Sequence, residues 1–342
     1  MAFTPPAAAP ATRRRHILPT LWLLILPAFI AEALSGATPP LTFFLQPNIL
    51  IAFSLYYGSG AILAREMSLR WHRGWPSVLL LGAAFAVIQE GLGTKVFFDP
   101  TRTELSPLVN YGTVGGVHWV FVIQLIIYHA VYSISLPVLL VELMFPSRRR
   151  ARWVGGLGLI LALVCLIVVT WLLFLIYPFQ PPAGPYVSAA ALAVMLCVVA
   201  RFAPTHLGAS GPRVASSSAL GPAPRAWPAR MYWLSGLIAG GLFFLVSFGA
   251  PAASIPPLVT AIALLVVAIG CAWLVMRNSA WGRAWSDRDQ LALAAGLLSP
   301  LIALAFLQET RGRSGSILVA LAAAVLLIWI ARRNSTRTQP LT

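Results

Sequence analysis

Long apolar runs separated by short polar segments repeat along the whole chain. Ten of these runs are each close to the ~20 residues that a helix needs to cross the hydrocarbon core of a membrane. They cover residues 17–36, 47–64, 75–97, 117–145, 152–178, 185–203, 230–249, 256–275, 290–307 and 314–331. Because lipid offers the backbone no hydrogen-bond partners, each run is expected to form a helix. The pattern therefore predicts an all-α polytopic membrane protein, a bundle of about ten transmembrane helices.

A segment rich in Gly, Pro, Ser and Ala divides the chain between the sixth and seventh runs. Residues 204–229 contain few apolar side chains and are expected to form a flexible linker. The linker separates a six-helix membrane part, 17–203, which carries the polar residues, from a four-helix membrane part, 230–331. Residues 1–16 and 332–342 are predicted to be tails. The linker and both tails are expected to be cytoplasmic.

The basic residues are distributed unevenly between the two sides of this predicted bundle. The chain is 59% hydrophobic and 10% charged, which excludes a soluble globular domain, and its formal net charge is +15. Of its 24 basic residues, 20 fall in the tails and in every second loop, and the four on the other side are Lys95, Arg102, Arg311 and Arg313. The positive-inside rule then predicts cytoplasmic termini, which an even number of spans allows. We expect a multi-pass protein of a bacterial-type plasma membrane. Its basic loops are expected to bind membrane lipids and not nucleic acid.

Two segments on the predicted outer side have a distinct composition. Residues 36–47 are uncharged and aromatic, as is typical of an interfacial loop. Residues 98–116 carry Asp99, Arg102 and Glu104 together with Gly and Pro, which predicts an ordered surface loop or lid.

The sequence contains no metal-binding or cofactor motif at a persuasive spacing. Cys165, Cys197 and Cys271 lie within predicted spans without a CxxC pair, so they are interpreted as packing residues. Nucleotide fingerprints and P-loops are also missing, and no cofactor is predicted. Residues 13–33 have the outline of a secretory signal, but the anchor-length apolar run favours a retained span.

Four of the nine acidic residues lie in or beside the first four apolar runs. Burying such a group in hydrocarbon costs about 2.5–3.5 kcal/mol, so each calls for an explanation. Glu32 and Glu142 are about one turn from the end of their runs and are expected to reach the interface. Glu66 follows the second run, and an ion pair with Arg70, its i+4 neighbour, is expected there.

Glu90 is the acidic residue that lies deepest. It is about 10 Å from the outer end of its predicted span, so it requires a proton or a partner. The next span supplies His118 and His129, which are eleven residues apart on one helix face, with Ser133 close to that face. Because consecutive spans with a short loop are antiparallel neighbours, Glu90 is expected at a depth between the two histidines. Gln89 can donate from its amide but diverges from Glu90 by about 100° around the helix.

These residues allow a catalytic and a structural interpretation. In the catalytic one, Glu90 is a general base and His129 positions water or stabilises an oxyanion. The supporting polar residues are Glu66, Arg70, Gln89, His118 and Ser133. In the structural one, Glu90 is protonated and bonds to a helix neighbour, which avoids the desolvation cost of an ion pair.

Short motifs between residues 60 and 145 add a family resemblance. The stretch "REMSLR" contains Glu66 and Arg70, "WPSVLLLGAAFAVIQ" contains Phe85, and "HAVYS" contains His129 and Ser133. This region resembles the CAAX-protease and bacteriocin-processing family (CPBP) of glutamic intramembrane proteases, whose motifs are Glu-Glu-x-x-x-Arg, Phe-x-x-x-His and His-x-x-x-Asn.

The same region departs from that family at two activating groups. Arg65 stands in the place of the first Glu, and Gln89 stands in the place of the motif's His. The resemblance therefore implies either a non-peptidase relative or an enzyme that uses Glu90 instead. A ten-span permease or proton-coupled transporter is one alternative, and a non-enzymatic membrane scaffold is another. The possible substrates are a membrane peptide and a small molecule, and the sequence does not decide between them.

Overall fold

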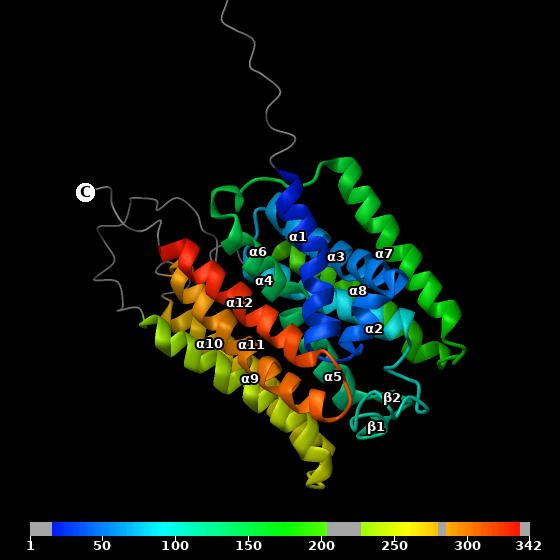
Figure 1. Ribbon diagram of the computed structural model, residues 1–342. Helices are drawn as coiled ribbons and strands as arrows, with labels where there is room; N and C mark the ends of the chain where they lie inside the picture. Colours follow the sequence, from blue (N-terminus) through cyan, green and yellow to red (C-terminus); the bar gives the residue numbers. More distant parts are fainter. Residues whose placement is uncertain (1–15, 204–226, 280–284, 336–342) are drawn as a thin grey trace, which may run out of the picture.

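The computed structural model describes residues 16–203, 227–279 and 285–335, and these residues form a helical bundle (Figure 1). Ten helices in the described residues are long and apolar enough to cross a membrane, which confirms the predicted fold class. They are Ile17–Leu34, Pro47–Arg70, Trp75–Gly93, Trp119–Met144, Gly156–Ile176, Ala183–Phe202, Ala229–Ala252, Pro257–Asn278, Asp287–Thr310 and Ser316–Asn334. The predicted tails and linker fall mostly outside the described residues.

Three of these spans consist of more than one helical segment. The elements of the first six spans are α1 (Ile17–Ala28), η2 (Phe29–Leu34), α2 (Pro40–Leu45), α3 (Pro47–Arg70), α4 (Trp75–Ala86), η3 (Val87–Gly93), α5 (Trp119–Tyr128), η4 (His129–Ser135), α6 (Leu136–Met144), η5 (Pro146–Arg148), α7 (Gly156–Ile176) and α8 (Ala183–Phe202). The segments η2, η3 and η4 are π-helical. A π-turn inserts an extra residue into an α-helix, and such turns are frequent at functional sites.

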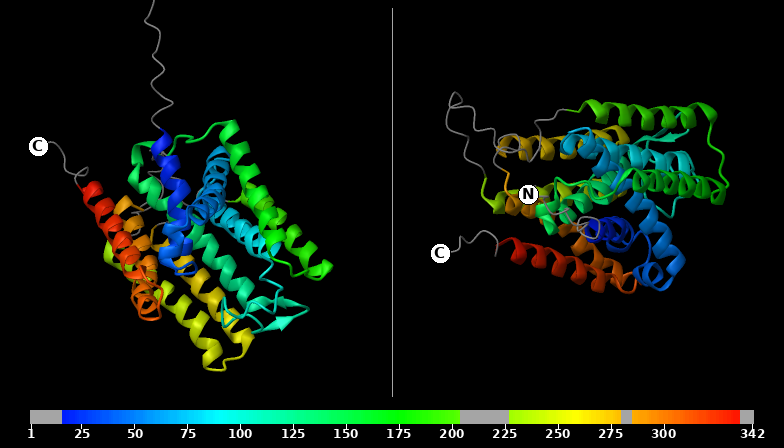
Figure 2. Two further views of the ribbon diagram at one scale, coloured as in Figure 1. Left: turned by 45° about the vertical axis from the view of Figure 1, so that its right-hand side comes forward. Right: turned by 90° about the horizontal axis from the view of Figure 1, so that it is seen from above.

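The last four spans are single α-helices that pack on one another. They are α9 (Ala229–Ala252), α10 (Pro257–Asn278), α11 (Asp287–Thr310) and α12 (Ser316–Ser335). Helix α9 contacts α10 and α11, and α11 contacts α12. At the junction with the first six spans, α10 contacts α5, α11 contacts α6, and α12 contacts η2. Helices α7 and α12 lie on opposite sides of the bundle in both views of Figure 2.

Glycines allow two helix pairs to approach to backbone contact. A Cβ atom on Gly236 of α9 would lie 2.6 Å from the carbonyl oxygen of Leu293 on α11. In the first six spans, a Cβ atom on Gly82 of α4 would lie 2.9 Å from the Cα atom of Ala130 on η4. The second approach matters for the site, because it brings the span that carries Glu90 against the span that carries His129.

The segment between η3 and α5 is ordered and connects to both parts of the bundle. It contains a two-stranded antiparallel hairpin, β1 (Thr113–Val114) and β2 (Val117–His118). The Tyr111 hydroxyl forms a hydrogen bond with the Thr260 hydroxyl of α10 at 2.8 Å. At its start, the buried ammonium group of Lys95 donates to the Phe174 and Tyr177 carbonyl oxygens at the end of α7. Lys95 therefore satisfies helix-end carbonyls that have no partner within the helix.

Candidate functional site

A carboxyl group and an imidazole ring meet inside the bundle. The Oε1 atom of Glu90, on η3, lies 3.0 Å from the Nε2 atom of His129, on η4. Both residues are buried, with 9% and 3% of their surface exposed. Hydropathy and loop length predicted that these two spans are neighbours. The structure places the side chains of Glu90 and His129 in direct contact. A catalytic role for either residue stays a prediction.

Each member of this pair has a second polar partner. The Thr94 hydroxyl donates to Glu90 Oε2 at 2.8 Å, and the Ser133 hydroxyl lies 2.9 Å from His129 Nδ1. Ser133 reaches the ring because it is four residues further along the same helical segment. Thr94, Glu90, His129 and Ser133 form a continuous hydrogen-bonded chain, which we call the histidine row.

A second chain of hydrogen bonds, the tyrosine row, runs beside the first. The Glu32 carboxyl group, on η2, accepts hydrogen bonds from the Thr38 hydroxyl at 2.6 Å and from the Tyr57 hydroxyl at 2.6 Å. The Gln89 amide donates to the Tyr57 hydroxyl at 2.7 Å. The tyrosine ring stacks on the His129 ring with 6.0 Å between centroids and 25° between planes. The two rows therefore share an aromatic contact. They also meet on η3, where Gln89 of the tyrosine row directly precedes Glu90 of the histidine row.

Sequence reasoning did not find the tyrosine row. It expected Glu32 to reach the membrane interface, but the structure buries this side chain, with 8% of its surface exposed. The reason is the π-turn of η2, which directs Glu32 toward α3, where Tyr57 donates to it. A tyrosine in an apolar helix gave no signal by itself, because most such tyrosines are packing residues.

Gln89 and His118 do not contact the Glu90 carboxyl group. Gln89 points to Tyr57, in accord with its angular separation from Glu90. His118 lies in β2, where its Nδ1 atom is 2.7 Å from the Thr113 hydroxyl. Eleven residues separate it from His129, roughly 16 Å along a helix. Burial lowers the pKa of His118, which favours the neutral ring in the folded loop.

Glu66 and Arg70 belong to a separate cluster of charges. Helix α3 continues to Arg70, so Glu66 lies within the helix and not after it as predicted. Its Oε1 atom is 2.6 Å from Arg65 Nη1 and accepts the Trp153 backbone N–H at 2.8 Å, while Oε2 pairs with Arg70. Nine residues of helix, roughly 13 Å, separate Glu66 from Tyr57. The cluster holds segment 146–154 against α3.

Glu142 is part of the same charged cluster. Arg65 Nε donates to Glu142 Oε1 at 3.1 Å, and the Arg65 guanidinium lies 3.4 Å from the ring centroid of Trp153. Glu142 was expected to reach the interface, and in the structure its carboxyl group pairs with Arg65 and Arg149. Each charge here has a partner of opposite sign, which is the arrangement of a structural ion-pair network.

The polar rows contain hydrogen-bonding groups suited to proton exchange. Among the described residues, no group of three or more His, Cys, Asp or Glu side chains could hold a metal ion. In the part of the chain that the structure describes, the hydrogen bonds and ion pairs of Glu90, Glu32 and His129 involve no Lys or Arg side chain. The imidazole and the two carboxyl groups can each gain or lose a proton, and hydroxyl groups connect them to their surroundings.

Comparison with known proteins gives one match. A family model described as an uncharacterized membrane protein family matches residues 21–338. A search of curated proteins finds no match. A search of solved structures also finds none.

The match corrects the resemblance to CPBP proteases. That resemblance was wrong, because the matching model describes another family and covers nearly the whole chain instead of residues 60–145. Short motifs of apolar and small residues recur by chance in membrane helices, and Glu66 and Arg70 form a structural ion pair here. The chain belongs to the uncharacterized membrane protein family whose model spans residues 21–338.

Proposed function

We propose that this integral membrane protein is a proton-coupled permease in which Glu90 and His129 bind the coupling proton. The observation that carries the proposal is the 3.0 Å contact between Glu90 Oε1 and His129 Nε2 inside the bundle. Ionisable residues within membrane spans are rare, and their default interpretation is a proton relay or a substrate pathway.

The energetics of the pair suit reversible protonation. A charged Glu90–His129 pair gains Coulomb energy, whereas a neutral pair avoids the desolvation of two ions. Proton binding would change the charge of the pair and the direction of the hydrogen bond that connects η3 to η4. This change is the step by which a proton could gate a pathway.

The tyrosine row supplies a connection to the surface. Thr38 is half-buried in the segment after η2, and its hydroxyl donates to the buried Glu32. From Glu32 the hydrogen bonds continue through Tyr57 to Gln89, next to Glu90. In the proposed permease this row keeps a second protonatable carboxyl group close to the pair.

Solute-driven proton movement into proteoliposomes tests the proposal. Vesicles that contain the protein and the pH dye pyranine are exposed to separate panels of amino acids, dipeptides and sugars. We expect at least one panel to acidify the vesicle lumen, and Glu90→Gln or His129→Asn to abolish that signal. Glu104→Gln is the matched control, because Glu104 is an exposed loop carboxylate paired with Arg102 and should leave the signal unchanged. Proton flux of wild-type size in Glu90→Gln vesicles, or no flux with any panel, would reject the proposal.

A second candidate function follows from the order of groups in the histidine row. A carboxyl group, an imidazole and the Ser133 hydroxyl are connected at 3.0 Å and 2.9 Å, the order that activates a serine nucleophile. In an acyl transfer, the Ser133 oxygen would bond to the acyl carbon. Its proton would pass to His129 and then to the leaving group. Ser133 is fully buried, so this candidate requires an opening of the bundle that the permease also requires.

A fluorophosphonate probe separates the two candidates. If Ser133 is a nucleophile, the probe labels the wild-type protein and not Ser133→Ala. Ser247 is a control, because its hydroxyl is also buried but donates to a carbonyl of its own helix. Lack of covalent label at Ser133 under conditions in which solutes drive proton flux would remove the hydrolase candidate and leave the permease.

A further inference from the structure

Glu32 is a buried carboxyl group without a cation beside it. It lies on η2 with 8% of its surface exposed. Its Oε1 atom accepts a hydrogen bond from the Tyr57 hydroxyl and its Oε2 atom accepts one from the Thr38 hydroxyl, each at 2.6 Å. In the described part of the chain, no ion pair includes Glu32. A negative charge buried in this way is costly, and a bound proton removes it.

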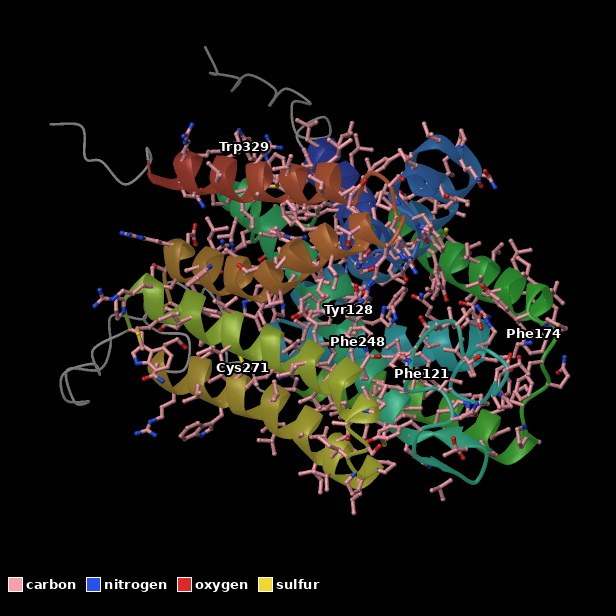
Figure 3. All side chains as sticks on the ribbon, turned by 60° about the horizontal axis from the view of Figure 1, so that its bottom comes forward. Phe121, Tyr128, Phe174, Phe248, Cys271 and Trp329 are labelled. Atoms are coloured by element: carbon pink, nitrogen blue, oxygen red, sulfur yellow. The ribbon has the colours of Figure 1, made fainter. Side chains whose placement is uncertain are left out.

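The titratable groups around Glu32 come from three neighbouring spans. They are Tyr57 of α3, Glu90 of η3, Tyr128 of α5 and His129 of η4. Tyr128, which lies near the centre of the bundle in Figure 3, donates to the carbonyl oxygen of Ala31, next to Glu32. The imidazole of His129 is held between Glu90 and Ser133 instead. None of these groups is a cation paired with Glu32, so a bound proton is what neutralises its carboxyl group.

The orientation of Tyr57 decides which oxygen of Glu32 takes the proton. The Gln89 amide donates to the Tyr57 hydroxyl at 2.7 Å, and this hydroxyl donates its own proton to Oε1. Oε2 then remains for an added proton, on the side of Thr38. An amide N–H does not dissociate, so Gln89 ends the path on the side of the histidine row. Proton exchange at Glu32 therefore takes place on the Thr38 side.

Residues 35–39, between η2 and α2, cover this end of the tyrosine row, and we call them the cover segment. Thr38 is half-buried in it. Its backbone N–H donates to the carbonyl oxygen of Glu32 at 3.2 Å, while its hydroxyl donates to the carboxyl group of the same residue. Both bonds fasten the cover segment over η2. The Oε2 atom of Glu32 is thus closed off by the Thr38 hydroxyl.

Two side chains from the last four spans also hold the cover segment. Gln308 of α11 donates from its amide to the Ser35 carbonyl oxygen, and Arg313 of the turn before α12 donates to the Gly36 carbonyl oxygen. The φ angle of Gly36 is +72°, and a Cβ atom there would lie 1.4 Å from the Gln308 Oε1 atom. Only glycine fits this position without moving Gln308. The cover over Glu32 is therefore tied to α11 and to the turn that follows it.

We propose that Glu32 is a second proton-binding site, which exchanges its proton with water on the side of Thr38 when the cover segment opens. In the open state, water takes the place of the Thr38 hydroxyl at Oε2. The proton that adds to Oε2 converts the carboxylate into a neutral carboxylic acid, and the Thr38 hydroxyl closes over it as an acceptor. Because Gln308 and Arg313 hold the cover segment, movement of the last four spans controls access. The site goes beyond the histidine row, and its exchange requires no flux through the proposed permease.

Infrared spectroscopy of the protein in nanodiscs tests for this proton. A protonated carboxyl group absorbs apart from carboxylate and amide groups, and Glu32→Gln should remove one such band. The band shifts when deuterium replaces the proton, so transfer into heavy water measures the exchange rate. Thr38→Val removes one hydrogen bond that closes the site, and exchange at Glu32 should be roughly five-fold faster. Thr94→Val is the matched control, because Thr94 bonds to Glu90 and should leave exchange at Glu32 unchanged.

Variants at the ties of the cover segment test the control of access. Arg313→Ala removes a charge-assisted hydrogen bond to the Gly36 carbonyl oxygen, so exchange at Glu32 should be roughly ten-fold faster. Gly36→Ala should act in the same direction, because the added methyl group displaces the Gln308 side chain from Ser35.

Two neighbouring positions supply matched controls for these variants. Arg311 is exposed two residues before Arg313. Gly312 has a positive φ of +82°, like Gly36, but nothing lies within 4 Å of its Cβ position. Arg311→Ala and Gly312→Ala should therefore keep the exchange rate of the wild type at Glu32.

Labelling with a water-soluble carbodiimide needs no variant of Glu32 itself. The reagent adds to protonated carboxyl groups that water reaches, and mass spectrometry locates the product. We expect Glu32 to be labelled faster in Arg313→Ala than in the wild type. Glu104, an exposed loop carboxylate, should be labelled equally in both. This measurement also identifies the site if Glu32→Gln does not fold.

Three results would reject the proposal. The first is that no carboxylic acid band and no carbodiimide product belongs to Glu32. The second is that Arg313→Ala and Arg311→Ala give the same exchange rate. The third is that Arg313→Ala accelerates exchange at Glu90 as much as at Glu32, which would indicate general loosening of the bundle. All three leave the flux test with Glu90→Gln independent, because they are measured without a transported solute.

Discussion

Tyr57 is the residue that connects most of the buried polar groups. Its hydroxyl donates to Glu32 and accepts from Gln89, and its ring stacks on His129. The side chain is only 1% exposed, so water cannot replace these bonds. Tyr56, its neighbour, is equally buried but has a simpler role, because its hydroxyl bonds to the Thr170 hydroxyl alone.

Replacement of these two tyrosines should therefore have unequal effects. Tyr57→Phe removes a donor to a buried carboxyl group and an acceptor for the Gln89 amide, so we expect a loss of about 1–3 kcal/mol in unfolding free energy. Tyr56→Phe removes one bond between hydroxyls and should cost about 0.5–1.5 kcal/mol. Denaturant unfolding in one detergent measures both. Equal costs for the two variants would contradict the assigned role of Tyr57.

His118 should make the stability of the loop between η3 and α5 depend on pH. Burial lowers its pKa, and the nearby Asp99 opposes that shift only in part. The unfolded loop, with an ordinary histidine pKa of about 6.5, then binds more protons than the folded loop. The stabilising contribution is therefore complete above about pH 6.5 and is lost as the pH falls through the lower folded pKa. Protonation also removes Nδ1 as an acceptor for the Thr113 hydroxyl.

Hydrogen exchange across residues 98–118 checks this pH dependence. After correction for intrinsic exchange rates, we expect less protection at pH 5 than at pH 7.5. The change should disappear in His118→Gln, while the amides of α7 serve as a reference for global stability. Protection that falls equally in the variant would assign the effect to another group.

At the level of helices, hydropathy predicts the spans but not their internal turns. All ten spans follow from apolar runs, because the cost of unpaired backbone groups in lipid leaves helix as the solution. The π-turns η2, η3 and η4 depend on contacts between spans, which one sequence does not contain. For this reason the contact between Glu90 and His129 followed from depth and loop length, whereas the direction of Glu32 did not.

Helix packing at Gly82 should control the distance between Glu90 and His129. A methyl group there would lie 2.9 Å from the Ala130 Cα atom and 3.1 Å from its carbonyl oxygen, and backbone atoms cannot rotate away. Gly82→Ala should thus separate α4 from η4 and cost about 1–3 kcal/mol in unfolding free energy. Gly241→Ala on α9 is the matched control, because nothing lies within 4 Å of its Cβ position and alanine favours helix.

Melting temperature and proton flux together measure the Gly82 effect. We expect Gly82→Ala to melt earlier than the wild type and to lose proton coupling at temperatures where it is folded. Gly241→Ala should match or exceed the wild type in melting temperature. Full coupling in Gly82→Ala would mean that the approach of α4 to η4 does not set the geometry of the pair.

At the scale of the whole molecule, η4 lies between the histidine row and helix α9. His129 and Ser133 on this segment join the histidine row, while Tyr132 contacts the Phe243 and Phe244 rings of α9. A shift of this one segment would therefore alter the polar pair and the contact with the last four spans together. Sequence reasoning predicted the contact of Glu90 with His129. It did not predict the contact of η4 with α9, because that contact depends on how the last four spans pack.

The orientation of the molecule in the membrane is the remaining prediction, and charge is its basis. The basic loops that collect at one end include Arg148, Arg149 and Arg150, whereas the other end holds few cations. Two of those few are held by local contacts, since Lys95 donates to carbonyls of α7 and Arg313 donates to the Gly36 carbonyl. Because uneven positive charge sets orientation, we expect the arginine-rich end and both termini in the cytoplasm.

A fusion of green fluorescent protein at the C-terminus should fluoresce, and alkaline phosphatase inserted within residues 98–116 should be active. An active phosphatase at the C-terminus together with an inactive one in that loop would invert the orientation, and with it the direction in which the proposed permease takes up its proton.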